Sequence, residues 1–142
     1  MTKSLTNINV LDFSHALSGP FCSMLLAELG AKIIKIEPPH GDHFRPANGG
    51  ATFAVVNRNK RSLCLDLKQP SASIIMERLI SKCDVILENF TPGTMKRLGY
   101  HYEALKKMKP DIIYASISGF GSTGPYKAVS YTHLRAHETP IN

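Results

Sequence analysis

Three polar side chains that suit a phosphorylated ligand stand shortly after runs of sequence with the pattern of β-strands. Lys68 follows the run 61–66, and Asn89 and Arg97 follow the run 84–88. Lysine offers phosphate a point charge, and arginine offers a planar fork that binds two oxygens. Each residue also has an ordinary structural role: a solvated lysine before a helix, an asparagine that bonds its own turn, a cation at a helix end. The binding interpretation predicts a phosphorylated small molecule as the ligand.

A glycine pattern near the end of the chain suggests a second nucleotide interpretation. Gly119-Phe-Gly-Ser-Thr-Gly124 has the G-x-G-x-x-G spacing of a dinucleotide-binding turn and follows a predicted strand. Pro125 and Tyr126 do not continue as the helix that such a turn requires, and the acidic residue expected about twenty positions on would fall in the tail described below. An NAD-dependent oxidoreductase is therefore a disfavoured alternative.

The sequence offers little metal or redox chemistry. Cys22, Cys64 and Cys83 are far apart and form no C-x-x-C pair, so we expect three reduced cysteines in the core. His133 and His137 are spaced like a helical metal pair, but no third ligand or acidic base accompanies them. We predict no metal site.

The composition fits one domain with an anionic partner. Of 142 residues, 43% are hydrophobic, and Lys plus Arg exceed Asp plus Glu by 17 to 11, which gives a formal charge of +6. The basic residues are scattered, whereas a nucleic-acid interface would gather them in a stripe with aromatic residues. No apolar run could span a bilayer and no signal-peptide pattern opens the chain. We expect a cytoplasmic protein without nucleic-acid or membrane partners.

Hydrophobic periodicity predicts alternating strands and helices. The expected strands are residues 8–13, 32–37, 61–66, 84–88 and 111–116, and the expected helices are 18–29, 70–82, 94–98 and 102–108. Ser18 as a cap and Pro20 in the first turn mark one helix start, and Gly30 marks its end. The polar segment 40–50, rich in Gly and Pro, is expected to be a loop outside the core.

Apolar residues at helical spacing indicate which helix faces meet the core. They are Phe21, Met24, Leu25 and Leu29 in the first helix, and Ile74, Ile75, Leu79 and Ile80 in the second. Each strand, helix and strand in succession forms a βαβ unit, whose right-handed crossover implies parallel strands. The repeat of this unit predicts an α/β fold with a Rossmann-like, doubly wound, mostly parallel sheet.

Five blocks of sequence, in order, resemble the family III CoA transferases. They are Asn9-Val-Leu-Asp-Phe13 through Glu37-Pro38, Asn59-Lys-Arg-Ser-Leu-Cys-Leu-Asp-Leu-Lys68, Asp84-Val-Ile-Leu-Glu-Asn-Phe-Thr-Pro-Gly93, Lys96-Arg-Leu-Gly99, and Ser116-Ile-Ser-Gly-Phe-Gly-Ser-Thr-Gly-Pro-Tyr126. This family includes formyl-CoA transferase, carnitine CoA transferase and α-methylacyl-CoA racemase. The resemblance implies an incomplete, N-terminal portion of the large CoA-transferase domain.

The resemblance also implies an activity and a partner. Transferases of the family move CoA between an acyl-CoA and a carboxylic acid acceptor through an aspartyl-CoA intermediate, and their subunits form an interlocked homodimer. Their nucleophilic Asp lies downstream of the matched blocks, so no residue of this chain is predicted to be catalytic, and coenzyme A enters as substrate rather than as a tightly bound cofactor. A 2-methylacyl-CoA racemase, or a CoA- or nucleotide-binding fragment without activity, are the alternatives.

The family's CoA-binding blocks map onto eleven positions of this sequence. They are Ala16, Leu17, Leu65, Lys68, Asn89, Phe90, Thr91, Arg97, Ile117, Ser118 and Gly119. Leu17 stands where the family often has Gln, and Pro38 where some members have Arg. The predicted pocket therefore lacks one cation that some relatives have.

The last stretch of the chain has no place in this pattern. Residues 129–142 show no hydrophobic period and resemble translated sequencing-adapter DNA found on unrelated sequences. We predict that residues 1–128 belong to the CoA-transferase domain and that 129–142 are a non-native tail.

Overall fold

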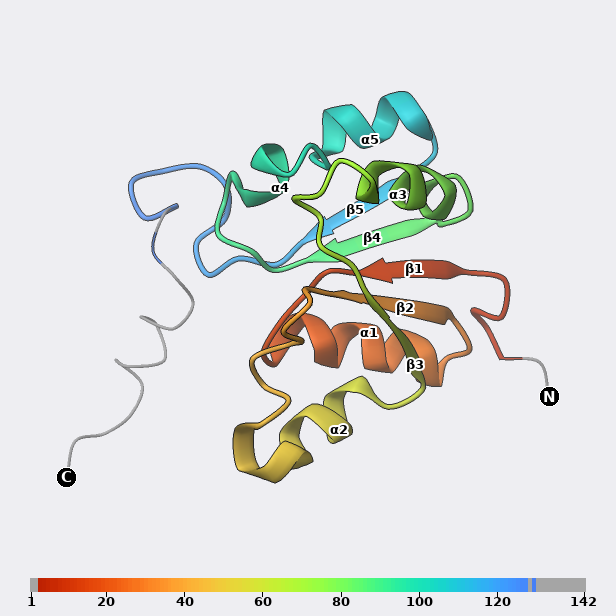
Figure 1. The fold of residues 1–142 in the computed structure, drawn as a ribbon, viewed down its shortest axis with the longest axis vertical. Helices are drawn as coiled ribbons and strands as arrows, with labels where there is room; N and C mark the ends of the chain where they lie inside the picture. Colours follow the sequence, from red (N-terminus) through yellow and green to blue (C-terminus); the bar gives the residue numbers. More distant parts are fainter. Residues whose placement is uncertain (1–2, 128, 130–142) are drawn as a thin grey trace.

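The computed structural model describes residues 3–127 and 129 (Figure 1). The strands are β1 (Asn9–Asp12), β2 (Lys32–Glu37), β3 (Lys60–Cys64), β4 (Val85–Glu88) and β5 (Ile113–Ser116). The helices are α1 (Ser18–Glu28), α2 (Ala51–Asn57), α3 (Ala72–Ile80), α4 (Thr94–Arg97) and α5 (Tyr102–Met108), with a 3₁₀ turn η1 (Ala47–Gly50) before α2. None of the described helices is long and apolar enough to cross a bilayer.

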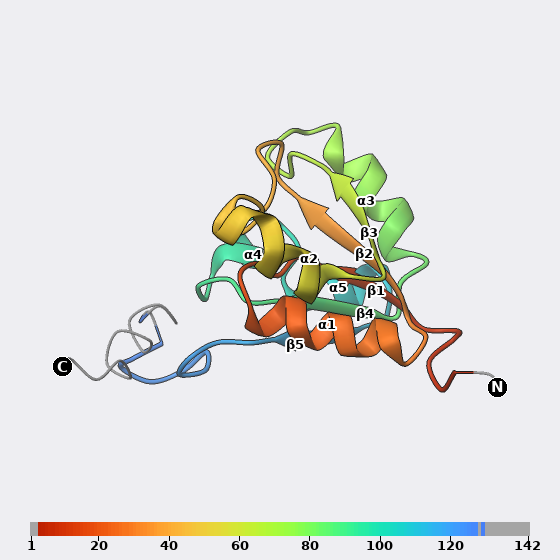
Figure 2. The same ribbon diagram turned by 90° about the horizontal axis from the view of Figure 1, so that it is seen from below.

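The five strands form one parallel sheet in the order β3-β2-β1-β4-β5. Helices α1 and α2 lie on one face of the sheet, and α3, α4 and α5 lie on the other (Figures 1 and 2). Helices must cover both faces because parallel strands need crossover connections. The predicted α/β class with a doubly wound parallel sheet is confirmed.

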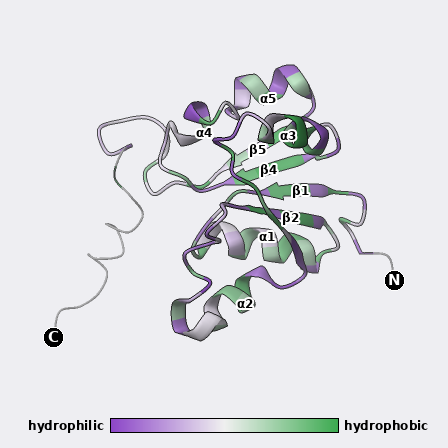
Figure 3. Cartoon of the chain, viewed as in Figure 1, coloured by the Kyte–Doolittle hydropathy of each residue, from purple (hydrophilic) through white to green (hydrophobic). Residues whose placement is uncertain are grey.

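The face beneath α3, α4 and α5 is mostly apolar, with the buried Glu88 near the end of β4 as an exception. Leu11, Phe13, Ile36 and Ile86 from the strands pack against Met76 and other buried residues of these helices. Much of β1, β2 and β4 has the colour of hydrophobic residues in Figure 3. This core fixes β1, β2 and β4 side by side, so their carboxyl ends meet at one edge of the sheet.

The face beneath α1 combines an apolar core with buried charges. Val10, Ile33 and Leu87 form a second core there. Further along the same face stand charged residues, Asp12 on β1 and Lys35 on β2, both almost fully buried. Alternation along a strand puts residues two apart on one face, so these charges continue the rows begun by Val10 and Ile33.

Helix α1 packs closely on the sheet, and the face that it buries differs in part from the predicted one. Its buried residues include Gly19, Ser23, Met24 and Ala27, and a Cβ on Gly19 would stand 2.2 Å from Ser14 Cβ. Small residues therefore face the strands, and three of the four predicted core residues, the apolar residues at 21, 25 and 29, are exposed by about half.

Helix α3 needs a similar correction. Ala72, Met76 and Ile80 form its buried stripe, whereas Ile74 and Ile75 are 58% and 43% exposed. Helical spacing of four residues joins the buried set, and the two misassigned isoleucines lie outside that stripe.

Two further predictions about individual segments are wrong. Cys64 is exposed, while Cys83 is buried and Cys22 is intermediate, although all three are free thiols as predicted. The segment 40–50 contains the buried Asp42 and ends in η1, and helix α2 follows it where no helix was predicted. The chain enters α2 through Gly50, whose φ of 85° a residue with a side chain rarely adopts.

Candidate functional site

The predicted binding residues gather at the carboxyl edge of the sheet. The chain order reverses between β1 and β4, which are neighbours in the sheet but are separated by β2 and β3 in sequence. In open parallel sheets, ligands bind outside the carboxyl ends of the strands at such a switch point. The loops after β1, β2, β3 and β4 therefore determine what this edge can bind.

A pocket of about 230 Å³ opens beside the loop that follows β3. Its lining includes Leu65, Lys68 and Phe90 from the predicted set, together with His15 and Leu98. Aromatic and aliphatic walls with one cation at the rim suit a flat heterocycle that carries phosphate.

A smaller pocket of about 60 Å³ lies on the other side of Phe90. Its lining includes six of the predicted residues, and Phe90 is the wall that both pockets share. The six are Asn89, Phe90, Thr91, Ile117, Ser118 and Gly119. Eight of the eleven predicted positions thus line two adjacent hollows at one edge of the sheet.

Asn89 holds the turn between β1 and α1 in place. Its Oδ1 accepts a hydrogen bond of 2.8 Å from His15 N, and its Nδ2 donates one of 2.8 Å to the His15 carbonyl. The turn contains Ala16, which has φ of 65°. Asn89 therefore bonds a distant turn rather than its own backbone, which was its predicted alternative role.

Three predicted residues lie outside both pockets. Ala16 and Leu17 are on the β1–α1 turn next to His15, and Leu17 is 41% exposed. Arg97 is exposed and donates from Nη2 to Thr94 Oγ1 at 2.8 Å. Its neighbours Thr94 and Leu98 line the larger pocket, so the guanidinium is beside that pocket without forming its wall.

A buried carboxylate on β2 organises the loop at this edge, and sequence analysis did not single it out. Glu37 accepts two hydrogen bonds from Arg45, at 2.6 and 2.7 Å, and one of 2.6 Å from Ser62 Oγ. Asp42 N donates a fourth at 3.0 Å. Burial acts to raise the pKa of Glu37, but the bonds from Arg45, Ser62 and the Asp42 amide outweigh it and lower the pKa to about 2.

The same loop places Asp42 against the site. Asp42 Oδ2 lies 3.0 Å from Lys35 Nζ and 3.4 Å from His15 Nδ1, and its Oδ1 accepts from Phe44 N at 2.9 Å. Burial acts to raise the pKa of Asp42, yet the contacts with His15, the Phe44 amide and Lys35 bring it well below its usual range.

The side chains of His15, Asp42 and His43 bring three metal-type ligand atoms within 4.8 Å of one another. The ammonium of Lys35 already occupies one Asp42 oxygen at 3.0 Å, and His43 is mostly exposed. A cation at that oxygen repels a metal ion, so we interpret the cluster as two imidazole rings around the Lys35–Asp42 ion pair.

A second buried ion pair lies between α1 and the sheet. Asp12 accepts hydrogen bonds from Ser14 and Ser23, and Lys60 Nζ lies 3.1 Å from its Oδ2. Lys60 also donates to the Pro20 carbonyl at 2.8 Å. These contacts tie β1, β3 and the start of α1 together, which supports the turn beneath the two pockets.

A cavity of about 480 Å³, larger than both pockets, is at the opposite edge of the sheet. Residues near the amino ends of β1 and β2 line it, with Leu79, Lys82 and Cys83 near the end of α3. None of the predicted binding residues lies there. Size alone does not mark the site, because the switch point is at the other edge.

Comparison with known proteins agrees with the resemblance in the sequence blocks. The family model described as CoA-transferase family III matches residues 5–132. This chain belongs to CoA-transferase family III. The match spans β1 to β5 and includes all eleven predicted binding positions.

Two relatives that are named as CoA-transferases are similar over most of the chain. It is 46% identical over 134 residues to a formyl-CoA:oxalate CoA-transferase of Bradyrhizobium diazoefficiens, covering 89% of this chain and 31% of the relative. It is 47% identical over 138 residues to an acetyl-CoA:oxalate CoA-transferase of Acetobacter aceti, covering 93% and 34%. The chain thus spans about a third of the length of these relatives.

Two solved structures share the fold. Rv3272 from Mycobacterium tuberculosis superposes with a TM-score of 0.86 at 38% identity, covering 90% of this chain and 36% of that one. A CAIB/BAIF family protein from Brucella suis gives 0.86 at 36% identity, covering 92% and 37%. The incomplete α/β portion predicted from the sequence is confirmed.

Proposed function

We propose that this chain is the N-terminal part of an acyl-CoA:carboxylate CoA transferase and holds the nucleotide-binding part of its CoA site. The observation that carries the proposal is the pair of pockets that Leu65, Lys68, Asn89 and Phe90 line at the switch point of the sheet. Two relatives are named for transfer of CoA to oxalate, which favours transfer over racemisation.

The two pockets suit different parts of coenzyme A. The larger one has apolar walls, the Phe90 ring and the Lys68 ammonium, which fit an adenine ring and a phosphate. The smaller one has backbone and hydroxyl groups at Ser118, Gly119 and Thr91 that suit the polar arm of the molecule. CoA is substrate in this account, and the nucleophilic Asp is expected beyond the matched segment.

The finer parts of the proposal concern the whole enzyme. We propose a cytoplasmic enzyme that acts as an interlocked homodimer on an acyl-CoA and a carboxylic acid, without nucleic-acid or membrane partners. We also propose that the native domain comprises residues 1–128 and that residues 129–142 are a non-native tail. Residues 130–142, with His133 and His137, lie outside the described residues.

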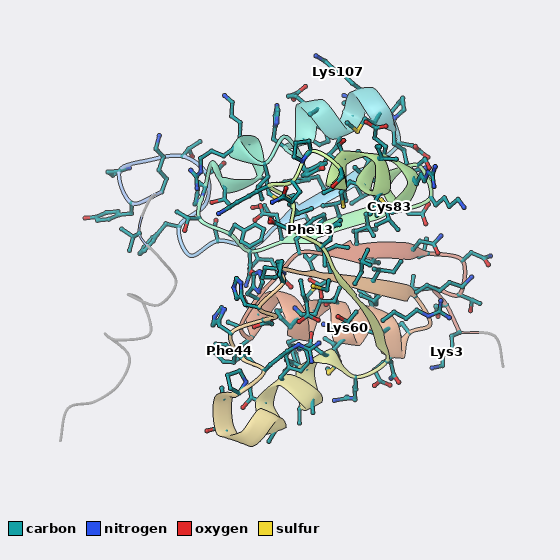
Figure 4. All side chains as sticks on the ribbon, in the orientation of Figure 1. Lys3, Phe13, Phe44, Lys60, Cys83 and Lys107 are labelled. Atoms are coloured by element: carbon teal, nitrogen blue, oxygen red, sulfur yellow. The ribbon has the colours of Figure 1, made fainter. Side chains whose placement is uncertain are left out.

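Calorimetric titration of the chain with CoA tests binding. We expect saturable heat, and a loss of affinity of about tenfold in Lys68→Met, because one charge-assisted bond is removed. Lys107→Met is the matched control, since Lys107 extends from α5 away from the pockets (Figure 4). No heat at high CoA concentration, or equal losses in both variants, would contradict the proposal; displacement of CoA by NADH would favour the oxidoreductase alternative.

The activity is tested on the complete enzyme. We expect exchange of CoA between formyl-CoA or acetyl-CoA and oxalate. Absence of exchange, together with racemisation of a 2-methylacyl-CoA, would replace the transferase proposal by the racemase alternative.

A further inference from the structure

The His15 side chain lies between the larger pocket and the buried Asp42 carboxylate. Its ring lines the pocket, and its Nδ1 is 3.4 Å from Asp42 Oδ2. That distance is longer than a good N–H···O bond, so the contact is an electrostatic one that a small ring rotation would shorten. Neither atom has a hydrogen bond within the described structure.

The His15 backbone is held as firmly as its ring. Both its N–H and its carbonyl bond Asn89 at 2.8 Å. The ring packs against Phe90, with centroids 5.4 Å apart, and against His43 at 5.7 Å. A side chain with a fixed backbone and aromatic neighbours presents its ring nitrogens in a preorganised direction.

Asp42 is fixed from the opposite side. It is 1% exposed, its amide bonds Glu37, and its Oδ1 accepts from the Phe44 amide. Its charge is balanced by Lys35, whose Nζ is 3.0 Å from Oδ2. Because Lys35 neutralises Asp42, His15 can face the carboxylate as a neutral imidazole with its Nδ1 proton toward Oδ2.

The second ring nitrogen is turned elsewhere. No described residue makes a hydrogen bond to Nε2 of His15, and unlike Nδ1 this atom is not fully buried. A ring that lines the pocket and turns Nδ1 toward Asp42 leaves Nε2 as the nitrogen available to a ligand. When Nδ1 carries the proton, Nε2 is an acceptor.

We propose that Asp42 is a positioning residue that holds His15 in the Nδ1–H tautomer, so that Nε2 accepts a hydrogen bond from a donor group of the ligand. This inference rests on the proposed CoA function for the identity of the ligand only. CoA carries suitable donors in its adenine amino group, ribose hydroxyl and amide N–H groups. The other charged groups around His15 are Lys35 and Glu37 on β2, His43 beside the ring, and Asp66 and Lys68 across the pocket.

Nitrogen-15 NMR of the labelled chain tests the tautomer directly. At about pH 9, where histidines are ordinarily neutral, long-range proton–nitrogen correlations of wild-type His15 should show Nδ1 protonated. Asp42→Asn should lose that preference, while the matched change Asp111→Asn, at an exposed carboxylate, should leave it intact. His15→Phe assigns the resonances.

Four outcomes decide the inference. An Nε2–H tautomer in wild-type His15 would overturn it, even if Asp42→Asn fails to fold. An unchanged tautomer in a folded Asp42→Asn protein would also overturn it. The predicted tautomer change, with about fivefold weaker CoA binding in Asp42→Asn, would support it; the tautomer change without any CoA binding to wild type would keep the positioning role and reject CoA as the ligand.

Discussion

The Glu37 carboxylate should make the stability of this domain depend on pH in a defined window. It is 2% exposed and accepts four hydrogen bonds, from Arg45 twice, Ser62 and the Asp42 amide. These bonds lower its pKa from the ordinary 4.5 to about 2. Because the folded pKa is depressed, the stabilisation is present above the unfolded pKa and is lost as pH falls from about 5 toward 2.

The size of this stabilisation follows from the difference between the ordinary and the folded pKa of Glu37. A shift from 4.5 to about 2 corresponds to a ceiling of about 3 kcal/mol, at 1.36 kcal/mol for each pH unit. The Arg45 side chain is 44% exposed, so solvent screening reduces its share, and we expect about 2 kcal/mol.

Urea denaturation followed by circular dichroism measures the prediction in wild type and Glu37→Gln. The difference in unfolding free energy should be about 2 kcal/mol near pH 7, should fall to about 1 kcal/mol near pH 3, and should approach zero only near pH 2 and below. Using the difference removes the parallel contribution of Asp42, whose pKa is also lowered. Glu77→Gln, on the exposed side of α3, is the control and should follow wild type. A Glu37→Gln difference that stays constant from neutral to acid pH would refute the reasoning.

Two further substitutions and one thiol-labelling experiment have defined outcomes. Lys60→Met should lower the unfolding free energy by about 3 kcal/mol in urea denaturation, because it leaves Asp12 buried without its cation; a loss below about 1 kcal/mol would contradict this. Asn89→Ala should lower the unfolding free energy by about 2 kcal/mol and weaken CoA binding in calorimetry, because two hydrogen bonds to the β1–α1 turn are lost. An unchanged unfolding free energy would contradict the role of these two bonds in holding the turn. In the folded chain, Cys64 should react with a thiol reagent at once and Cys83 only after unfolding, because burial raises the pKa of the Cys83 thiol to about 11; equal rates would contradict the burial pattern.

The sheet was predictable because its strands carry their own signal. Residues 85–87, for example, are apolar, and β4 pairs with a parallel strand on each side. The turn at Gly30, with φ of 106°, also needed only local information. Local preference and tertiary packing agree at these places, so sequence reasoning located them well.

Helix α2 and the buried charges depend on contacts that no local pattern contains. The β-branched residues Thr52, Val55 and Val56 give α2 a mixed propensity. Glu37 is buried because Arg45 and Ser62 arrive from a loop and another strand. A usable signal was nevertheless present: Lys35 and Glu37 stand two apart in an apolar strand, which implies buried partners.

The grouping of the candidate residues was predictable at the level of loops but not of side-chain directions, and their binding of CoA stays a prediction. The residues chosen from the family resemblance lie in the loops after β1, β3, β4 and β5, and these loops end near one another at one edge of the sheet. Arg97 lies outside the pockets because α4 is a single turn whose Thr94 and Leu98 face inward. In so short a helix, tertiary packing rather than hydrophobic periodicity decides which side faces the pocket.

Amide chemical-shift mapping during a CoA titration tests the central claim most directly. The account predicts that the shifts concentrate at Leu65, Lys68 and Phe90, at the carboxyl edge of the sheet. Shifts that concentrate instead at Lys32 and Lys82, around the cavity of about 480 Å³ at the amino edge, would contradict it.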